Sequence, residues 1–247
     1  MNARTFVGQV VRRLLFTACR VLQEVAGDRP VPLSRIRRIR SLSPVTNGLV
    51  PPVGRGRWAL DDDALAFIVG EVERRRPSWV LEFGSGRSTV RLAEVMADIT
   101  SGDGVVVISI EQDRKFVART THLLREMGLV DRVRLTCRQL RRQIVAGRET
   151  LCYDLSTELT PEFVPREGSG LILVDGPAGG GDVRFGTIPL IQPYLPDETP
   201  FFLDDALRDD ELQVADAWAK LPGFAVHGIR VVGEGLLVGS VDATTSS

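Results

Sequence analysis

The feature that most constrains this fold is an apolar run that ends in a glycine-rich turn and leads into a helical stretch. From Val80 to Thr89 the sequence reads VLEFGSGRST. Glycines in the turn permit backbone geometries and close ligand approach that a Cβ would block. Ser88 or Thr89 can cap the helix, and the free N–H groups at its start favour a carboxylate or phosphate. The third glycine of the dinucleotide pattern G-x-G-x-x-G would fall at Thr89 and is absent.

Short apolar runs alternate with helical stretches after residue 60. Expected strands span 79–83, 105–111, 132–137, 171–175 and 201–205. Expected helices span 65–72, behind three aspartates, and 89–97, 114–127, 138–147, 185–194 and 209–221. Such alternation is typical of βαβ units, and nearly continuous apolar strands indicate a sheet covered on both faces. We therefore predict an α/β, Rossmann-like, doubly wound, mostly parallel seven-stranded sheet.

Both ends of the chain depart from this alternation. The last two expected strands, 224–232 and 235–241, are separated by Gly-Glu-Gly, which predicts an antiparallel C-terminal hairpin. Apolar residues recur at helical spacing over 5–26, and the segment 29–57 is rich in Pro, Gly and Arg. We divide the chain into an N-terminal amphipathic helix followed by an irregular arm (together 1–57), a cofactor-binding domain (58–241) and a flexible tail (242–247).

Charge and cysteine content narrow the function classes. The formal net charge is −1, although nine arginines precede residue 50. The arginine clusters have no interleaved aromatic residues, which argues against nucleic acid as a partner. Three cysteines without metal-like spacing indicate a reducing compartment, and no apolar run reaches the length of a membrane span. We therefore expect a cytoplasmic protein without a transmembrane segment.

An acidic residue follows the second expected strand. Glu111 ends the run VVVISIE and lies 25 residues after Gly86 in the glycine turn. A carboxylate at this strand tip is placed to accept hydrogen bonds from both hydroxyls of a ribose. Together, the glycine turn and Glu111 predict a nucleoside-containing ligand at the carboxyl edge of the sheet.

Four motifs in this order carry a resemblance to a known family. They read E-F-G-S-G-x-S-T, S-I-E-Q-D, L-V-D-G-P and F-L-D-D-A-x-R-D-D-E, within residues 60–241. The series resembles class I S-adenosylmethionine-dependent methyltransferases, and most closely their small-molecule O-methyltransferase-like branch. The resemblance implies methyl transfer from S-adenosylmethionine to a small-molecule acceptor, most simply at a hydroxyl.

The same resemblance assigns cofactor-binding roles by position. Glu82 would hold the methionine amine, Gly84–Gly86 would wrap the amino-acid part, Glu111 would bind the ribose and Gln112 would lie beside the adenine. The full implied set is Glu82, Gly84, Ser85, Gly86, Ser88, Thr89, Glu111, Gln112, Asp175, Gly176 and Pro177. Two departures stand out: many relatives carry Asp at the position of Glu82, and here the third strand is not followed by an acidic residue near the adenine amine.

Aspartates at the tips of the fourth and fifth expected strands form the candidate catalytic and metal site. Because parallel strand ends share one edge, Asp175, Asp204 and Asp205 are expected to converge. They could hold Mg²⁺, which prefers carboxylate ligands, or one could act as general base. Alternatively, Asp204 or Asp205 caps the following helix or pairs with Arg208. Metal-dependent relatives have an Asp-Asn pair and a lysine that this chain lacks.

Other features carry weaker signals. His122 is expected to be a surface or packing residue, and His227 lies on the first strand of the expected C-terminal hairpin. The run Gly179–Gly181 borders the expected site as an acceptor loop or a plain linker. The basic amphipathic N-terminal helix could pack on its own domain, on a second copy or partner, or on a membrane surface.

Three other functions remain open from the sequence. An aminopropyl transferase uses a related fold and would employ the aspartates to bind a polyamine. A non-catalytic cofactor-binding scaffold would recruit a partner through the N-terminal helix. A nicotinamide dehydrogenase is disfavoured by the missing third glycine.

Overall fold

The computed structural model describes residues 3–41, 60–102, 104–155 and 168–243, with side chains from residue 14 onward. Residues 42–57 of the expected arm and residues 244–247 of the expected tail lie outside these ranges. None of the described helices combines the length and apolar character that a membrane crossing requires.

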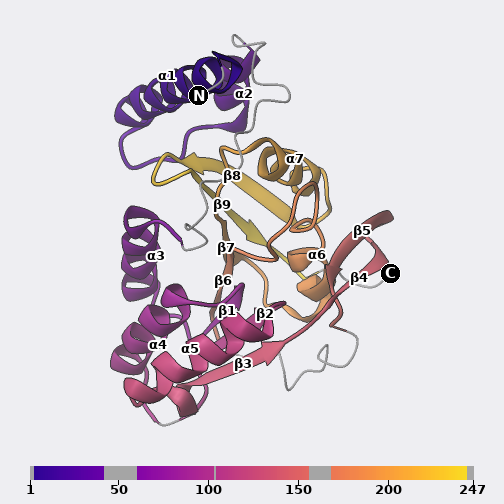
Figure 1. Cartoon of the computed structure of the whole chain (residues 1–247). Coiled ribbons are helices and arrows are strands. Elements are labelled where there is room, and N and C mark those ends of the chain that lie inside the picture. The colour runs from indigo at the N-terminus through magenta and orange to yellow at the C-terminus, as the bar shows by residue number, and fades with distance from the viewer. Residues whose placement is uncertain (1–2, 42–59, 103, 156–167, 244–247) are drawn as a thin grey trace.

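A twisted seven-stranded sheet forms the centre of the molecule, in the order β3-β2-β1-β6-β7-β9-β8 (Figure 1). The neighbouring strands from β3 to β7 pair in parallel, whereas β9 is antiparallel to both β7 and β8. This confirms the predicted mostly parallel sheet with an antiparallel C-terminal hairpin. The strands are β1 (Trp79–Phe83), β2 (Val107–Glu111), β3 (Val133–Cys137), β6 (Gly170–Val174), β7 (Thr199–Leu203), β8 (Phe224–Arg230) and β9 (Leu236–Val241).

Helices cover both faces of the sheet (Figure 1). One face carries α3 (Asp62–Arg75), α4 (Arg87–Ile99) and α5 (Arg114–Glu126); the other carries α6 (Thr187–Ile191) and α7 (Asp209–Trp218). Short 3₁₀ turns lie at η2 (Val130–Arg132) and η3 (Gln192–Tyr194). Alternate residues of each strand feed two hydrophobic cores: Val80 joins the α3–α4 core, whereas Leu81 and Phe83 join the α6–α7 core.

The strand order places a crevice beside β1. The chain runs from β1 outward to β2 and β3, then returns to the other side of β1 as β6. Ligands of open α/β sheets bind beyond the carboxyl ends of the strands where the order reverses in this way. The glycine turn follows β1 and Asp175 follows β6, so both lie at this reversal.

The helix predicted over residues 138–147 is wrong. The segment forms an antiparallel hairpin of β4 (Leu140–Val145) and β5 (Arg148–Tyr153). Ala146 and Gly147 both have positive φ, at 48° and 76°, as a two-residue turn of a hairpin requires. The positive φ values at the turn and the buried residues of β5 favour a hairpin, although Arg138, Arg141 and Arg142 have helical spacing.

The N-terminal arm is more regular than expected. After α1 (Ala3–Ala26), the supposedly irregular segment contains α2 (Leu33–Ser41). Val31 forms a bridge with Ile229 of β8, and Ile36 is fully buried in the core that α6 and α7 share. Helical spacing lets α2 bury one apolar position between arginines, two of which pair with α7. These pairs are Arg37–Asp216 and Arg40–Asp209.

Candidate functional site

A pocket of about 410 Å³ opens at the carboxyl ends of the parallel strands. One end is lined by Gly84, Ser85, Glu111 and Gln112, and we call it the loop end. The other is lined by Asp175, Arg184, Asp204, Asp205 and Glu211, and we call it the aspartate end. The structure thus brings most of the predicted site residues to one continuous pocket.

The glycines allow the loops after β1 and β6 to touch. Gly84 has φ of +103°, and a Cβ built there would lie 3.1 Å from the amide nitrogen of Gly176. A Cβ on Gly176 would lie 2.9 Å from the Cα of Gly84. Both loops are anchored to β1, because the amides of Asp175 and Gly176 donate to the carbonyl of Phe83. Side chains larger than hydrogen would push the two loops apart.

Glu111 is the centre of the loop end. Its Oε2 accepts from the amide and hydroxyl of Ser85, at 2.9 and 3.1 Å. Its Oε1 accepts from the amides of Gln112 and Asp113, at 2.7 and 2.8 Å. The carboxylate therefore ties the glycine turn to the end of β2 and presents fixed negative charge to the pocket.

Glu82 lies beneath the glycine turn and does not line the pocket. Its side chain is fully buried, and its carboxylate accepts from Thr89 at 2.5 Å, from Ser109 at 3.1 Å and from Ser88. Burial raises the pKa of Glu82 to about 7, against the opposing effect of the three hydroxyl donors. Glu82 therefore stabilises the glycine turn through its hydrogen bonds to Ser88 and Thr89.

The remaining expected loop residues also have structural partners. Thr89 accepts from the amide of Gly86 at 3.0 Å, so its hydroxyl both caps α4 and reaches Glu82. Gln112 lines the pocket, and its side-chain nitrogen donates to the carbonyl of Ala178 at 3.0 Å. Pro177 is buried beside the pocket-lining Gly176.

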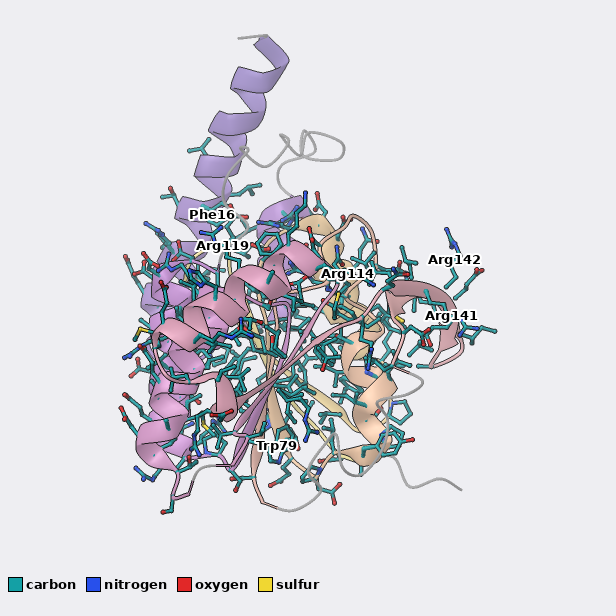
Figure 2. All side chains as sticks on the ribbon, turned by 60° about the horizontal axis from the view of Figure 1, so that its bottom comes forward. Phe16, Trp79, Arg114, Arg119, Arg141 and Arg142 are labelled. Atoms are coloured by element: carbon teal, nitrogen blue, oxygen red, sulfur yellow. The ribbon has the colours of Figure 1, made fainter. Side chains whose placement is uncertain are left out.

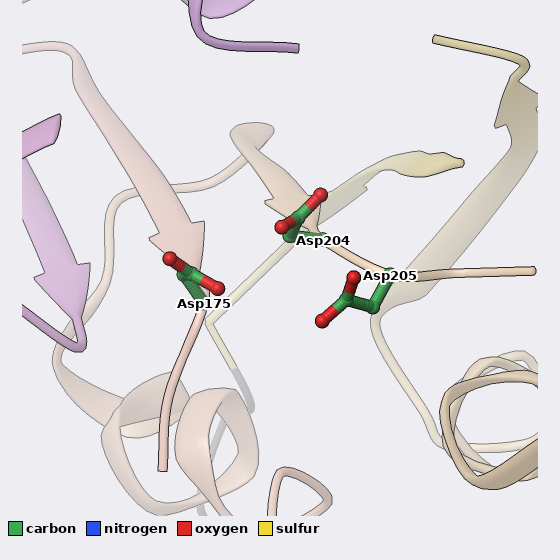
Figure 3. Close-up of side chains that lie close together, drawn as sticks. All are labelled: Asp175, Asp204 and Asp205. Atoms are coloured by element: carbon green, nitrogen blue, oxygen red, sulfur yellow. The ribbon is translucent and has the colours of Figure 1, made fainter. Parts of the chain in front are cut away.

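The three predicted aspartates converge at the aspartate end (Figure 3). Their carboxylate oxygens lie within 4.8 Å of one another. Burial raises the pKa of Asp204 to about 7, with Asp205 adding repulsion. Burial and the charge of Asp204 also raise the pKa of Asp175 well above its ordinary value. The three carboxylates therefore lie close enough to raise one another's pKa, and they could share a proton or a cation.

Arg184 occupies this cluster and was not identified from the sequence. Its guanidinium lies 3.4 Å from Asp205, 3.7 Å from Asp175 and 3.6 Å from Glu211. It also donates to the backbone carbonyls of Asp175 and Asp204, at 2.6 and 3.0 Å. Glu211 ends the fourth motif but was not assigned to the site, and Arg184 lies outside the four motifs. Neither residue occupies a strand tip, so neither was expected beside the aspartates.

The predicted helix-capping role of Asp204 or Asp205 is wrong. The α7 helix has Arg208 at its N-cap position and no side-chain cap hydrogen bond. The alternative pairing with Arg208 is confirmed for Asp205, at 2.7 Å. Asp204 is less fully hydrogen-bonded than Asp205, because its buried Oδ1 has no hydrogen-bond partner among the described residues.

Tyr153 is a second pocket residue that the sequence analysis missed. It closes the β4–β5 hairpin, stacks on Phe83 with ring centroids 5.8 Å apart, and lines the pocket. Its hydroxyl is buried without a hydrogen-bond partner in the described part of the chain. Because a helix was expected at 138–147, nothing in the sequence placed this hydroxyl at the site.

The histidines lie away from the pocket. His122 is exposed on α5, 3.4 Å from Glu126, and His227 is exposed on β8. The Gly179–Gly181 loop does border the site: Gly179 lines the pocket, and the amide of Gly181 donates to Asp210 at 2.7 Å. The loop is thus tied to the first turn of α7.

Comparisons with known proteins give matches among solved structures only. No protein-family model and no curated protein matches the sequence. An O-methyltransferase from Bacillus cereus in complex with SAH aligns over 90% of this chain and 96% of its own, with TM-score 0.56 and 15% identity. The SAH-bound methyltransferase PaMTH1 from Podospora anserina aligns over 92% and 95%, with TM-score 0.55 and 17% identity.

A third structure, the O-methyltransferase TomG from Streptomyces achromogenes in complex with SAM, aligns over 75% of this chain and 82% of its own. Its TM-score is 0.53 at 17% identity. At such low identity these likenesses establish the architecture. The chain has the Rossmann-like fold of class I S-adenosylmethionine-dependent methyltransferases.

Proposed function

We propose that this protein is an S-adenosylmethionine-dependent methyltransferase that acts on a hydroxyl of a small-molecule acceptor. One observation carries the proposal: a single pocket joins the fixed carboxylate of Glu111 to the clustered carboxylates of Asp175, Asp204 and Asp205. A methyltransferase needs these two functions side by side, because the acceptor must meet the methyl group within about 3 Å. The S-adenosyl ligands of the matched structures support the choice of cofactor.

The loop end fits an adenosyl cofactor. Glu111 offers a carboxylate to ribose hydroxyls, Gln112 borders the same end, and Gly84 and Gly176 leave room that a Cβ would fill. The cofactor would supply an activated methyl on a sulfonium. Ser85 and Glu82 contribute by fixing the turn, through the hydrogen bonds that join them to Glu111 and to Ser88 and Thr89.

The aspartate end handles the proton of the acceptor. Asp204 combines a raised pKa with an oxygen that has no partner among the described residues. A base with a pKa near the working pH is the most effective proton acceptor. We assign Asp204 as the group that takes the hydroxyl proton, and Arg184 as the cation that limits repulsion between Asp175 and Asp205.

In a second version of this proposal, a divalent cation assists the methyl transfer. Asp175, Asp204 and Asp205 are the residues that would hold Mg²⁺, and clustered carboxylates are its preferred donors. The ion would lower the pKa of the acceptor hydroxyl. The carboxylates at the aspartate end outnumber Arg184 and Arg208, which favours an additional cation. Calorimetric titration with Mg²⁺ alone distinguishes the versions: wild type binds and Asp204→Asn does not if the metal version is correct.

Calorimetry with S-adenosylmethionine and S-adenosylhomocysteine tests the proposed function. We expect wild type to bind both, and Glu111→Ala to bind each at least about tenfold more weakly, because charge-assisted hydrogen bonds to the ribose are lost. Glu126→Ala, an exposed change on α5, is the control. Absence of binding to wild type, or unchanged affinity in Glu111→Ala, would refute the cofactor assignment.

An aminopropyl transferase remains the second candidate function. The excess of carboxylates at the aspartate end also suits a polyamine. Titration with decarboxylated S-adenosylmethionine decides between the two: preference for this ligand over S-adenosylmethionine would favour aminopropyl transfer.

We also propose that α1 binds a second copy of the chain. Leu14, Val21 and Val25 are 64%, 52% and 75% exposed and recur at helical spacing. Deleting the arm is a poor test, because Val31 and Ile36 belong to the core. The double change Val21→Glu and Val25→Glu should leave the unfolding temperature unchanged and lower the mass measured by light scattering. An unchanged mass would argue against self-association through α1.

A further inference from the structure

The β4–β5 hairpin carries an aromatic side chain into the pocket. Its outer part projects from the molecule with Arg141 and Arg142 (Figure 2), whereas Tyr153, in the pair furthest from the turn, is 1% exposed. The Tyr153 ring stacks on Phe83 of β1 at an interplanar angle of 26°, and the Tyr153 carbonyl accepts from Gln143 Nε2 at 2.8 Å. Ring and backbone are both held, so the hydroxyl oxygen has a fixed position.

The Tyr153 hydroxyl lies between the two ends of the pocket. A Cβ built on Gly176 would lie 2.7 Å from this hydroxyl, so the phenol oxygen lies against the loop that follows β6. The charges that act on it come from both ends: Glu111 belongs to the loop end, and Arg184 and Asp175 belong to the aspartate end. In the proposed function the adenosyl group fills the first end and the acceptor fills the second. The atoms between them are the sulfur and its methyl group, so the hydroxyl would face these atoms.

This hydroxyl is neutral and has no partner in the described part of the chain. Burial raises the pKa of Tyr153 well above its ordinary value; Glu111 adds to the effect and Arg184 opposes it. The proton therefore stays on the oxygen at neutral pH. Neither the O–H nor a lone pair is used in a hydrogen bond to a described residue. Since the stacking on Phe83 does not involve the hydroxyl, the oxygen is available to a ligand.

We propose that Tyr153 is a specificity-determining residue whose phenol oxygen binds the positively charged sulfonium and methyl of S-adenosylmethionine. The inference rests on the proposed function and concerns a residue outside the four sequence motifs. An oxygen lone pair attracts a neighbouring cation, and a site shielded from water strengthens that attraction. S-adenosylhomocysteine has a neutral sulfur and no methyl group, so it gains nothing from this oxygen. Tyr153 therefore favours binding of the cofactor over binding of the product formed from it.

The variant Tyr153→Phe removes the oxygen and keeps the stacked ring. Three ligands with the same adenosine and amino-acid parts serve as probes: S-adenosylmethionine, S-adenosylhomocysteine and sinefungin, in which a carbon bearing an ammonium group replaces the sulfur and its methyl. Calorimetry on the full chain should show that Tyr153→Phe binds sinefungin about tenfold more weakly than wild type, because an ammonium donates a charge-assisted hydrogen bond to the oxygen. Binding of S-adenosylmethionine should weaken about threefold, through loss of weaker C–H···O contacts. Binding of S-adenosylhomocysteine should be unchanged.

Tyr194→Phe is the matched control, because Tyr194 is the other tyrosine of the chain and does not line the pocket. This change should alter none of the three affinities. Thermal unfolding without ligand gives a second readout. Tyr153→Phe should unfold at the wild-type temperature or above it, because a buried hydroxyl without a partner does not stabilise the native state. A lower unfolding temperature would show that the hydroxyl has a structural partner in the free protein, and would overturn the inference.

The outcomes of the titrations separate this inference from the proposed function. If Tyr153→Phe weakens all three ligands equally, Tyr153 does not distinguish a charged from a neutral sulfur. If its affinity for sinefungin is unchanged, the oxygen does not reach the position of the methyl group. Either result overturns the inference while the methyltransferase proposal stands. If wild type binds none of the three ligands, the proposed function fails and this inference fails with it.

Discussion

The two ends of the pocket use carboxylates in opposite ways. At the loop end, Glu111 accepts four hydrogen bonds from backbone amides and a hydroxyl, and Glu82, beneath the glycine turn, accepts three from hydroxyls. At the aspartate end, Asp175, Asp205 and Glu211 share the guanidinium of Arg184. Asp204 and Glu211 each keep a buried oxygen without a hydrogen-bond partner among the described residues.

This difference separates carboxylates held by neutral donors from carboxylates with too few partners. Neutral donors arranged around a carboxylate hold it in one position, and the glycine turn stays in place with them. Carboxylates that repel one another and share too few cations instead gain free energy by taking up a proton or a metal ion. If the proposed function is correct, the loop end is organised before a ligand arrives, whereas the aspartate end is completed by a bound proton or cation.

The largest expected effect is the removal of the shared cation. Arg184→Met leaves three carboxylates without their guanidinium and two backbone carbonyls without a donor. Breaking a buried ion pair from one side costs about 3–5 kcal/mol. We expect the free energy of unfolding, measured in urea at pH 7, to fall by that amount.

Two companion variants keep this experiment interpretable. Arg208→Met removes a guanidinium that is 30% exposed and should cost about 1 kcal/mol or less. Arg184→Lys retains the charge and should be intermediate, even if Arg184→Met does not fold. If Arg184→Met and Arg208→Met lowered the free energy of unfolding equally, burial would not be the reason that Arg184 stabilises the protein.

An intermediate effect is expected at the loop end. Glu82→Gln disturbs a buried carboxylate that accepts from Ser88, Thr89 and Ser109, and should cost about 2 kcal/mol at pH 5. The folded pKa of about 7 lies above the ordinary value of 4.5. The native state therefore binds more protons between these pH values, and wild-type stability falls as pH rises through them. The cost of Glu82→Gln should accordingly shrink at pH 8; a larger cost at pH 8 than at pH 5 would contradict the raised pKa.

The smallest effect is expected for Asp204→Asn, with the opposite sign. The pKa of Asp204 is raised from 3.8 to about 7, so its ionisation also destabilises the native state as pH rises through that window. The variant should match wild type at pH 5 and be about 1 kcal/mol more stable at pH 8, measured by thermal unfolding. If Asp204→Asn were instead less stable than wild type at pH 8, the ionised carboxylate of Asp204 would have favourable partners that its unpaired oxygen does not indicate.

The main elements of the fold followed from the sequence, and the exceptions have a physical cause. Strands β1, β2, β6 and β7 are short, nearly continuous apolar runs. Such runs are typical of buried strands, so the sequence pattern predicted all four. The 140–153 hairpin was missed because a helix was predicted over 138–147, whereas the positive φ of Ala146 and Gly147 selects a turn. The α2 helix was missed because Pro and Arg dominate its surroundings, and its burial depends on the core that Ile36 shares with α6 and α7.

For the site, the sequence by itself determined which carboxylates stand at strand tips. Parallel strands end at one edge of the sheet, so Glu111, Asp175 and Asp204 had to lie near one another once the strands were identified. Only the tertiary structure decided their partners. In the structure, Glu82 lies beneath the glycine turn and Arg184 pairs with the aspartates. Tyr153 reaches the pocket from the β4–β5 hairpin, and a second cavity, lined in part by Arg119, adjoins the pocket. Local patterns predicted most of the strands and helices, but contacts between distant segments depend on how the elements pack, and no local pattern records that packing.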